Sequence, residues 1–264
     1  MQEIGKSYTS LEEAIYQAYS AKYTKKTLLF DTNNEYGKYK IGSTWHNIRA
    51  LPHNEIISFG NSKVPEVRRI IPFHPNGMPM GPEETEALLI KVITQFRGGT
   101  LIIEDLNTIY GDSLPVSISG LLCNVRHRNC FVILHLQSIG RLLPKMRQNT
   151  KLVRYHYQLD SVDESRDKLK DDFEIFKIAE KMVNKQFLAG NKYFLVYIYR
   201  VIKKLKGKFS NRMLTEAIQE YLSENMKTLR STMEKRGADG KKIYNYQQAL
   251  NIKTVELYSK YQGN

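Results

Sequence analysis

The sequence predicts an α/β fold: a mostly parallel sheet flanked by helices, followed by a helical, basic C-terminal region. Helical and strand patterns alternate from the N-terminus to about residue 200. Two apolar strand patterns, residues 100–105 and 131–137, end abruptly in polar residues, as strands do at the ligand-binding edge of an open sheet. After Lys208 only helical patterns remain.

The first elements follow from apolar spacing and from their flanking residues. Apolar residues at helical spacing predict a helix over residues 7–23, and a short apolar run predicts a buried strand over 27–31. Residues 37–81 are rich in Gly, Pro, His and Asn, and only 67–73 has a strand pattern there. Proline and glutamates in the first turn predict a helix over residues 82–96, which two glycines end.

Alternation continues after the strand at residues 100–105. The same patterns predict, in chain order, a helix over 114–125, a strand over 131–137, a strand over 152–157, a long charged helix over 163–185 and a strand over 193–199. No internal repeat interrupts them. We therefore expect a core domain over residues 1–200 and a helical appendage over residues 201–264.

The chain is basic, and the excess charge is uneven. The net charge is +13 over 264 residues. From Arg200 to Asn264 there are fourteen Lys and Arg residues but only six Asp and Glu residues, with tyrosines interleaved. This surplus favours a polyanionic partner, most simply nucleic acid, over the alternative of a solubilising surface.

Cysteine content and hydropathy narrow the expected location. Cys123 and Cys130 are too few for a disulfide framework, and with His127 they lack the spacing and fourth ligand of a zinc site. No apolar run approaches the roughly 18 residues that span a bilayer, and the N-terminus lacks a signal peptide's apolar segment. We expect no membrane association and a cytoplasmic or virion-associated protein.

Gly5, Lys6 and Ser7 stand directly before the first predicted helix. In a phosphate-binding loop, Gly-x4-Gly-Lys-Ser/Thr, backbone amides hold phosphates, the lysine contacts their oxygens and the hydroxyl binds Mg²⁺. Only four residues precede Gly5 and none is glycine, so the loop pattern is incomplete. The alternative is a helix that Ser7 caps.

Glu104 and Asp105 follow an apolar strand, as the Mg²⁺-binding and water-activating carboxylates of nucleotide triphosphatases do. Their order is the reverse of the usual Asp–Glu, which leaves the division of roles open. Surface salt bridges or a helix cap are the structural alternative. With Ser7, these two residues are the candidate metal ligands.

Four further residues are candidates for the same chemistry. Gln137 ends the next strand, where an amide can bind a γ-phosphate and an attacking water. Arg126 and Arg128 precede that strand, and a guanidinium can stabilise the transferred phosphoryl group, often from a neighbouring subunit. Glu35, after the strand at 27–31, could help to position water. The alternative in each case is a polar side chain that forms its hydrogen bonds within its own loop.

Together these signals resemble the HerA/FtsK superfamily of P-loop ATPases, which includes DNA translocases, viral genome-packaging ATPases and the Zot-like proteins of filamentous phages. The resemblance covers roughly residues 1–200. It rests on these segments in order: Gly5-Lys6-Ser7-Tyr8-Thr9, Leu-Leu-Phe-Asp31-x-Asn-x-Glu35-Tyr36, Leu-Ile-Ile-Glu104-Asp105, Val125-Arg126-His127-Arg128, and Leu-Gln137-Ser with Leu143-Pro144 and Asn149.

The resemblance implies a RecA-like ATPase core that binds ATP and Mg²⁺, forms a homo-oligomeric ring and moves DNA, as in a phage or mobile element. It implies that Lys6 and Ser7 bind phosphates and Mg²⁺, that Glu104 and Asp105 form the Walker B site and that Gln137 senses the γ-phosphate. An arginine before that strand, Arg126 or Arg128, would act across a subunit boundary. The missing loop glycine and the Glu–Asp order depart from the family pattern.

Three other functions stay open at this point. A non-hydrolysing structural or assembly protein could keep the fold, and the incomplete loop favours it. A terminase-like packaging motor can use a loop of Gln-x-x-Gly-Lys-Ser character, with which Gln2 is compatible, but no acidic cluster after residue 160 indicates a nuclease site. A secretion protein of the Zot type would need a transmembrane segment.

Overall fold

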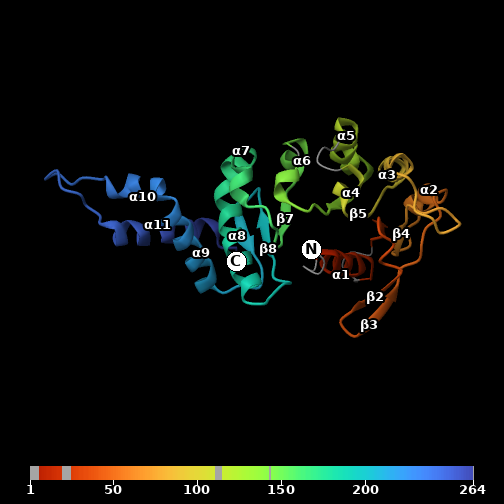
Figure 1. Cartoon of the computed structure of the whole chain (residues 1–264), viewed down its shortest axis with the longest axis horizontal. Coiled ribbons are helices and arrows are strands. Elements are labelled where there is room, and N and C mark those ends of the chain that lie inside the picture. The colour runs from red at the N-terminus through yellow and green to blue at the C-terminus, as the bar shows by residue number, and fades with distance from the viewer. Residues whose placement is uncertain (1–5, 20–24, 111–114, 143, 264) are drawn as a thin grey trace. The chain divides into compact units, whose positions relative to one another are not determined.

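The computed structural model describes residues 6–19, 25–110, 115–142 and 144–263, and these form two compact units (Figure 1). The first unit ends at Asn149 and the second begins at Thr150. The unit boundary therefore differs from the domain boundary predicted near residue 200. Whether the functional core extends to residue 200 stays a prediction.

A four-stranded parallel sheet forms the centre of the first unit. Its strands are β1 (Thr27–Phe30), β4 (Val67–Ile70), β5 (Thr100–Ile103) and β6 (Phe131–Leu134), in the spatial order β4-β1-β5-β6. All three pairings are parallel, and Thr27, Thr100 and Phe131 lie in register. The residues that follow each strand consequently lie along one edge of the sheet.

Helix α1 (Lys6–Tyr19) covers one face of this sheet. Its apolar stripe, Leu11, Ala14 and Ala18, is almost fully buried. The stripe packs in one cluster with a residue of each strand, namely Leu29, Val67, Ile102 and the partly buried Ile133. The helical spacing of these apolar residues is what the sequence predicted, and burying them fixes α1 across the strands.

The remaining elements of the first unit include several that the sequence did not predict. Residues 37–81 contain an antiparallel hairpin of β2 (Lys38–Ile41) and β3 (Thr44–Asn47) and the short helix α2 (Ile56–Asn61). The predicted helix at 82–96 is α3 (Pro82–Gln95). The other elements are α4 (Leu106–Tyr110), α5 (Val116–Asn124), α6 (Pro144–Asn149) and the 3₁₀ turns η1 (Val125–Arg128) and η2 (Ile139–Arg141).

The second unit has its own sheet, which is antiparallel. Strands β7 (Leu152–Tyr155), β8 (Val196–Tyr199) and β9 (Lys204–Lys206) pair in the order β7-β8-β9. The strands predicted at 152–157 and 193–199 thus exist but do not extend the parallel sheet. Their alternating pattern, with one face half-buried, is typical of antiparallel strands.

The long helix predicted over residues 163–185 is wrong in its first half. The structure has η3 (Val162–Ser165), α7 (Arg166–Leu169) and η4 (Lys170–Asp172) before the uninterrupted helix α8 (Phe173–Leu188). Lys170 has a positive φ of 49°, which a continuous right-handed helix does not allow. Periodicity alone did not reveal this break.

Three helices complete the second unit: α9 (Asn211–Glu224), α10 (Met226–Met233) and α11 (Tyr246–Tyr261). α9 packs on α8 and α11, and α10 also packs on α11. Among the described residues, no helix is both long and apolar enough to cross a membrane. The predicted α/β class, with a mostly parallel central sheet and a helical C-terminal part, is confirmed.

Candidate functional site

Polar side chains gather along the carboxyl edge of the parallel sheet. Asp31 follows β1, Glu104 and Asp105 follow β5, and His135 follows β6. Asp31, Glu104 and His135 are at most 7% exposed. Buried ionisable groups at the end of apolar strands require specific partners, because burial without them is costly.

The segment after β1 is built around Asp31. The two Asp31 carboxylate oxygens accept hydrogen bonds from the backbone N–H groups of Glu35, at 2.9 Å, and Tyr36, at 3.1 Å. Arg69 of β4 pairs with the same carboxylate at 2.7 Å. The Asp31 carboxylate is therefore fully used in contacts that hold this loop in place. The loop in turn places Glu35 at the sheet edge.

This loop also contacts the residues after β5. The Thr32 hydroxyl donates to the carbonyl oxygen of Glu104 at 3.0 Å, and the Asn33 amide donates to the Asp105 carboxylate at 3.4 Å. Asp105 has a positive φ of 43°, an uncommon conformation for a residue other than glycine. Strained backbone of this kind concentrates at functional sites.

The carboxylates at this edge lie close enough to repel one another. Desolvation, followed by the negative charges of Asp31, Asp105 and Glu104, raises the pKa of Glu35 above its usual range. Glu35 is exposed and titrates in contact with water. The structure thus brings together the three predicted carboxylates, Glu35, Glu104 and Asp105, in a region of negative potential.

Two short contacts through His135 join Glu104 to helix α1. His135 Nδ1 lies 2.9 Å from Glu104 Oε1, and His135 Nε2 contacts the Ser10 hydroxyl. Although the same residue types form hydrolase triads, Ser10 lies within a helix and is 2% exposed, so no substrate reaches it.

The Ser10 contact brings the first turns of α1 to the carboxyl edge. Ser7 lies three residues before Ser10, about 4.5 Å away along the helix axis at 1.5 Å per residue. The backbone N–H groups at a helix N-terminus attract anions. Gly5 lies outside the described residues, and so do the side chains of Lys6 and Ser7, whose roles stay predictions.

The other predicted residues divide between the two edges of the sheet. Gln137 is exposed and lies two residues beyond His135 on the carboxyl side. Arg128 precedes β6 and therefore lies at the opposite edge, where its carbonyl oxygen accepts a bond from the Gly98 N–H. The four residues of β6 separate the edges by about 13 Å at 3.3 Å per residue. The side chain of Arg126 lies outside the described part.

Arg128 therefore does not reach the carboxylates at the carboxyl edge of its own sheet. Its Nε and Nη2 atoms are buried and have no hydrogen-bond partner among the described residues. A buried guanidinium without an acceptor is unfavourable. This arrangement is compatible with an acceptor supplied by another molecule.

The sequence interpretation missed two residues of this site, Ser10 and His135. His135 stands between an apolar strand and Gln137, so the polar end of β6 begins two residues earlier than expected. Ser10 occupies a position flanked by the buried stripe of α1. Both are polar residues on faces that periodicity assigns to the core, and that signal could have identified them.

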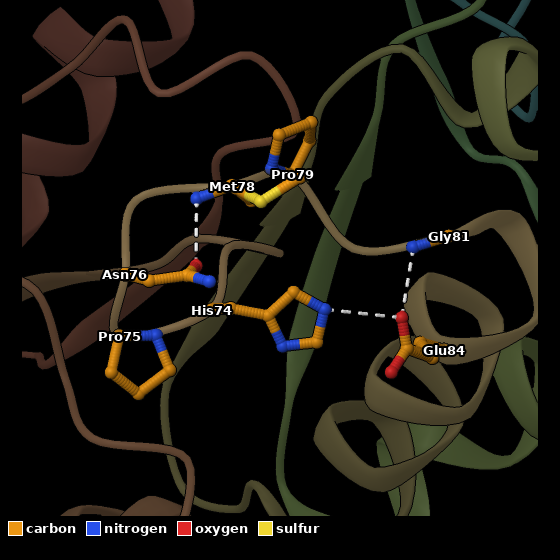
Figure 2. Close-up of a pocket in the computed structure, with 7 residues that line it drawn as sticks. All are labelled: His74, Pro75, Asn76, Met78, Pro79, Gly81 and Glu84. Atoms are coloured by element: carbon orange, nitrogen blue, oxygen red, sulfur yellow. Dashed lines mark hydrogen bonds and ion pairs between the residues drawn. The ribbon is translucent and has the colours of Figure 1, made fainter.

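An open pocket lies further along the same edge, beyond β4 (Figure 2). His74 Nε2 pairs with Glu84 Oε2 at 3.3 Å, and the same oxygen accepts a bond from the Gly81 N–H (Figure 2). Glu84 thereby caps the start of α3. These polar groups stabilise the loop before α3, and the pocket adds nothing to the carboxylate cluster.

The carboxylate cluster fits Mg²⁺ only in the company of phosphates. Among the described residues no three His, Cys, Asp or Glu side chains are arranged to hold a metal ion by themselves. Mg²⁺ usually binds through one or two carboxylates together with phosphate oxygens and water. Glu104 and Asp105 supply two carboxylates, and the raised pKa of Glu35 marks charge that a cation would neutralise.

No protein-family model matches the chain, and no curated protein matches it either. Among solved structures, the chain is similar to the genome packaging NTPase B204 of Sulfolobus turreted icosahedral virus 2 in complex with AMP. The TM-score is 0.50 at 15% identity, over 78% of this chain and 92% of that one. The complex of the same NTPase with ATP-γS has a TM-score of 0.49 at 17% identity, over 78% and 91%.

The fold is thus that of a P-loop NTPase, with a parallel sheet flanked by helices. At 15% identity the likeness extends to the fold alone. Function has to be argued from the site.

Proposed function

We propose that this chain is an ATPase that binds Mg²⁺–ATP at the carboxyl edge of its parallel sheet and acts on DNA as an oligomer, as a viral or phage genome-packaging motor does. The N-terminus of α1, with Lys6 and Ser7, binds the phosphates. Glu104 and Asp105 hold the metal ion and polarise the attacking water. Gln137 contacts the γ-phosphate, and Glu35 positions water.

One observation carries this proposal. Contacts from Ser10 to His135 and from His135 to Glu104 bring the start of α1 and the paired carboxylates to the same sheet edge. A helix N-terminus favours anions, whereas a carboxylate cluster favours cations. A metal-bound polyphosphate is the ligand that satisfies both at once, and B204, with its similar fold, was crystallised with nucleotides.

In this proposal different residues of the chain have separate roles in the reaction. Bound Mg²⁺ would neutralise charge on the phosphates. His135 fixes one oxygen of Glu104, so the carboxylate keeps a single orientation. Arg128, or Arg126, reaches the nucleotide of the neighbouring subunit, which agrees with the buried guanidinium atoms of Arg128 that have no acceptor in the described part of the chain.

DNA is the proposed partner because the net charge is +13 and the surplus is concentrated after Arg200. A homo-oligomeric ring follows from the resemblance to HerA/FtsK ATPases and from the position of Arg128 at the far sheet edge. We further propose that residues 1–200 form the ATPase core, and that the protein acts in the host cytoplasm or in the virion.

Two substitutions test the nucleotide site. Lys6→Ala should abolish ATP binding, because the lysine ammonium contacts only phosphate. Glu104→Gln should retain ATP binding but lower Mg²⁺-dependent turnover by about a hundredfold or more, because general-base work is lost. Binding is measured by calorimetry, and turnover by phosphate release with and without duplex DNA. A folded Lys6→Ala protein with unchanged affinity, or Glu104→Gln with wild-type turnover, would refute the site.

A second function has a specific observation in its favour. Glu104, the candidate water-activating residue, is buried, and one of its carboxylate oxygens contacts His135. In a non-hydrolysing assembly protein such an ion pair would serve stability alone. Wild-type protein that binds ATP but releases no phosphate, in the presence of Mg²⁺ and DNA, would establish this alternative.

A further inference from the structure

A short basic hairpin joins α10 to α11 in the second unit. Arg236 and Lys242 are paired across its two arms, and the Gly237 N–H donates to the carbonyl oxygen of Lys241 at 2.9 Å. Asp239 accepts from the Lys241 N–H at 3.1 Å, which closes the turn. The loop is thus folded by its own hydrogen bonds, and Figure 1 shows it extending beyond the ends of both helices.

Four cations occupy this hairpin: Lys235, Arg236, Lys241 and Lys242, which we call the hairpin cations. All four are exposed, and none forms an ion pair with any residue that the structure describes. Arg236 donates only to the carbonyl oxygen of Gly240, within the turn. Asp239 is the one carboxylate among residues 235–242, so four cations face a single anion in this hairpin.

Many cations elsewhere in the second unit are neutralised. Lys181 bridges two glutamates of α9, and Lys185 and Arg212 both pair with Glu216. Further ion pairs hold Lys177, Arg200, Lys203, Lys253 and Lys260. The hairpin cations have no ion-pair partner among the described residues and are gathered on one loop, so they are available for an anion outside the chain.

The hairpin also exposes cations on both of its arms. Successive residues of an extended arm point to opposite faces, so paired arms present cations on both faces. A two-stranded ribbon fits the major groove of B-DNA, where phosphates line both sides. Ile243 and Tyr246, 49% and 38% exposed, lie directly after it and offer apolar contact.

We propose that the α10–α11 hairpin binds the phosphate backbone of duplex DNA through the hairpin cations. This inference deepens the proposed function, because it assigns the DNA contact to one defined loop of the second unit. Unlike the nucleotide site, the hairpin requires no ATP, so the two can be tested separately.

The test compares two triple variants that remove the same charge. The hairpin variant is Lys235→Gln, Lys241→Gln and Lys242→Gln, which spares Arg236 because its guanidinium stabilises the turn. The control variant is Lys185→Gln, Arg212→Gln and Lys260→Gln, whose side chains are half-exposed or more but ion-paired. Binding of a labelled DNA duplex is measured by anisotropy in the full chain, without nucleotide, over a series of salt concentrations.

Each phosphate contact contributes about 0.9 to the slope of log affinity against log salt, so the hairpin variant should flatten that slope by about 2 to 3. Its affinity at low salt should fall by at least about tenfold, whereas the control variant should change the slope by less than one. Lys241→Arg with Lys242→Arg should bind as the wild type does. Unfolding followed by circular dichroism verifies that each variant is folded.

Three outcomes would overturn the proposal: a folded hairpin variant with the wild-type slope, a control variant that flattens the slope equally, or polyglutamate that displaces the duplex as well as unlabelled duplex does. The last result would indicate an acidic protein partner instead. ATP turnover is measured on the same samples. If the hairpin variant loses DNA binding but keeps its ATP turnover, the result supports the hairpin proposal independently of the ATPase. If the wild-type protein shows no turnover, only the proposed ATPase function is contradicted.

Discussion

Carboxylates in the two units have pKa values shifted in opposite directions. At the sheet edge of the first unit, desolvation and three neighbouring carboxylates raise the pKa of Glu35. In the second unit, hydrogen bonds from Lys177 foremost lower the pKa of Asp163. Burial alone would raise the pKa of Asp172, but Lys203 and Arg200 outweigh it, so that pKa is also lowered.

The opposite pKa shifts distinguish charges that are neutralised within the chain from a charge that its neighbours repel. In the second unit, most buried carboxylates have a lysine or arginine from the same chain beside them, as Asp172 does. At the first sheet edge, Arg69 pairs with Asp31 and His135 contacts Glu104, but the neighbouring carboxylates repel the charge of Glu35, and perturbed groups of this kind concentrate at functional sites. In the second unit the hairpin cations have no ion-pair partner among the described residues.

The largest effect should come from breaking the contact between His135 and Glu104 at the sheet edge. His135→Leu leaves Glu104 buried without its imidazole, which should lower the free energy of unfolding by about 3 kcal/mol. ATP turnover should fall as well, because Glu104 loses its fixed orientation. Urea unfolding of the full chain and steady-state turnover measure the two effects.

A matched pair of variants separates positioning from general loosening. His135→Asn places an amide N–H near the position of Nδ1, so it should restore part of both stability and kcat. Thr100→Val removes another buried polar contact to α1, the bond from the Thr100 hydroxyl to Gln17, without touching Glu104. It should lower stability but leave kcat near the wild-type value. Equal kcat for the Leu and Asn variants would exclude a positioning role for His135.

A smaller effect is expected in the second unit. Asp172→Asn removes the charge that Arg200 and Lys203 share, which should cost about 2 kcal/mol at neutral pH. Because the folded pKa of Asp172 is lowered, its contribution is complete above the unfolded value of about 4 and is lost as the pH falls below it. The difference between the variant and the wild type should therefore shrink in acid, as urea unfolding at pH 7 and pH 3 will test. A difference as large at pH 3 as at pH 7 would contradict the ionic origin.

The parallel sheet was predictable because its strands are apolar and its helices are periodic. β1 and β5 are buried on both faces, and their apolar runs are visible in sequence for that reason. β6 is also an apolar run, although Phe131 is exposed and the rest of the strand is half-buried. The β2–β3 hairpin was not predicted, since its residues are largely exposed and polar. The break at Lys170 was missed because it depends on backbone geometry at one residue.

The site was predictable where residues follow strands directly. Glu35, Glu104 and Asp105 do lie together, because parallel strands end at one edge. The Ser10–His135 contact joins residues 125 positions apart, and no local pattern reports such a pairing. Arg128 was expected beside a nucleotide, and the structure places it at the opposite edge of the sheet from the carboxylates.

The smallest expected effect concerns Glu35, and it tests directly whether the carboxylates of the two units differ. Glu35→Gln removes one repelling charge from the sheet edge, so it should raise stability at pH 7, by less than about 1 kcal/mol because Glu35 is exposed.

A raised folded pKa means that the native state binds the proton more readily than the unfolded chain. The penalty of the ionised form is therefore complete above the folded pKa, and it disappears as the pH falls to the unfolded value of about 4.5. The gain in unfolding midpoint should consequently vanish near pH 4, and saturating Mg²⁺–ATP should reduce it at pH 7. Glu12→Gln, an exposed change on α1, should show neither dependence. A Glu35→Gln protein that is less stable than the wild type at pH 7 would show that this edge is neutralised from within, as the second unit is.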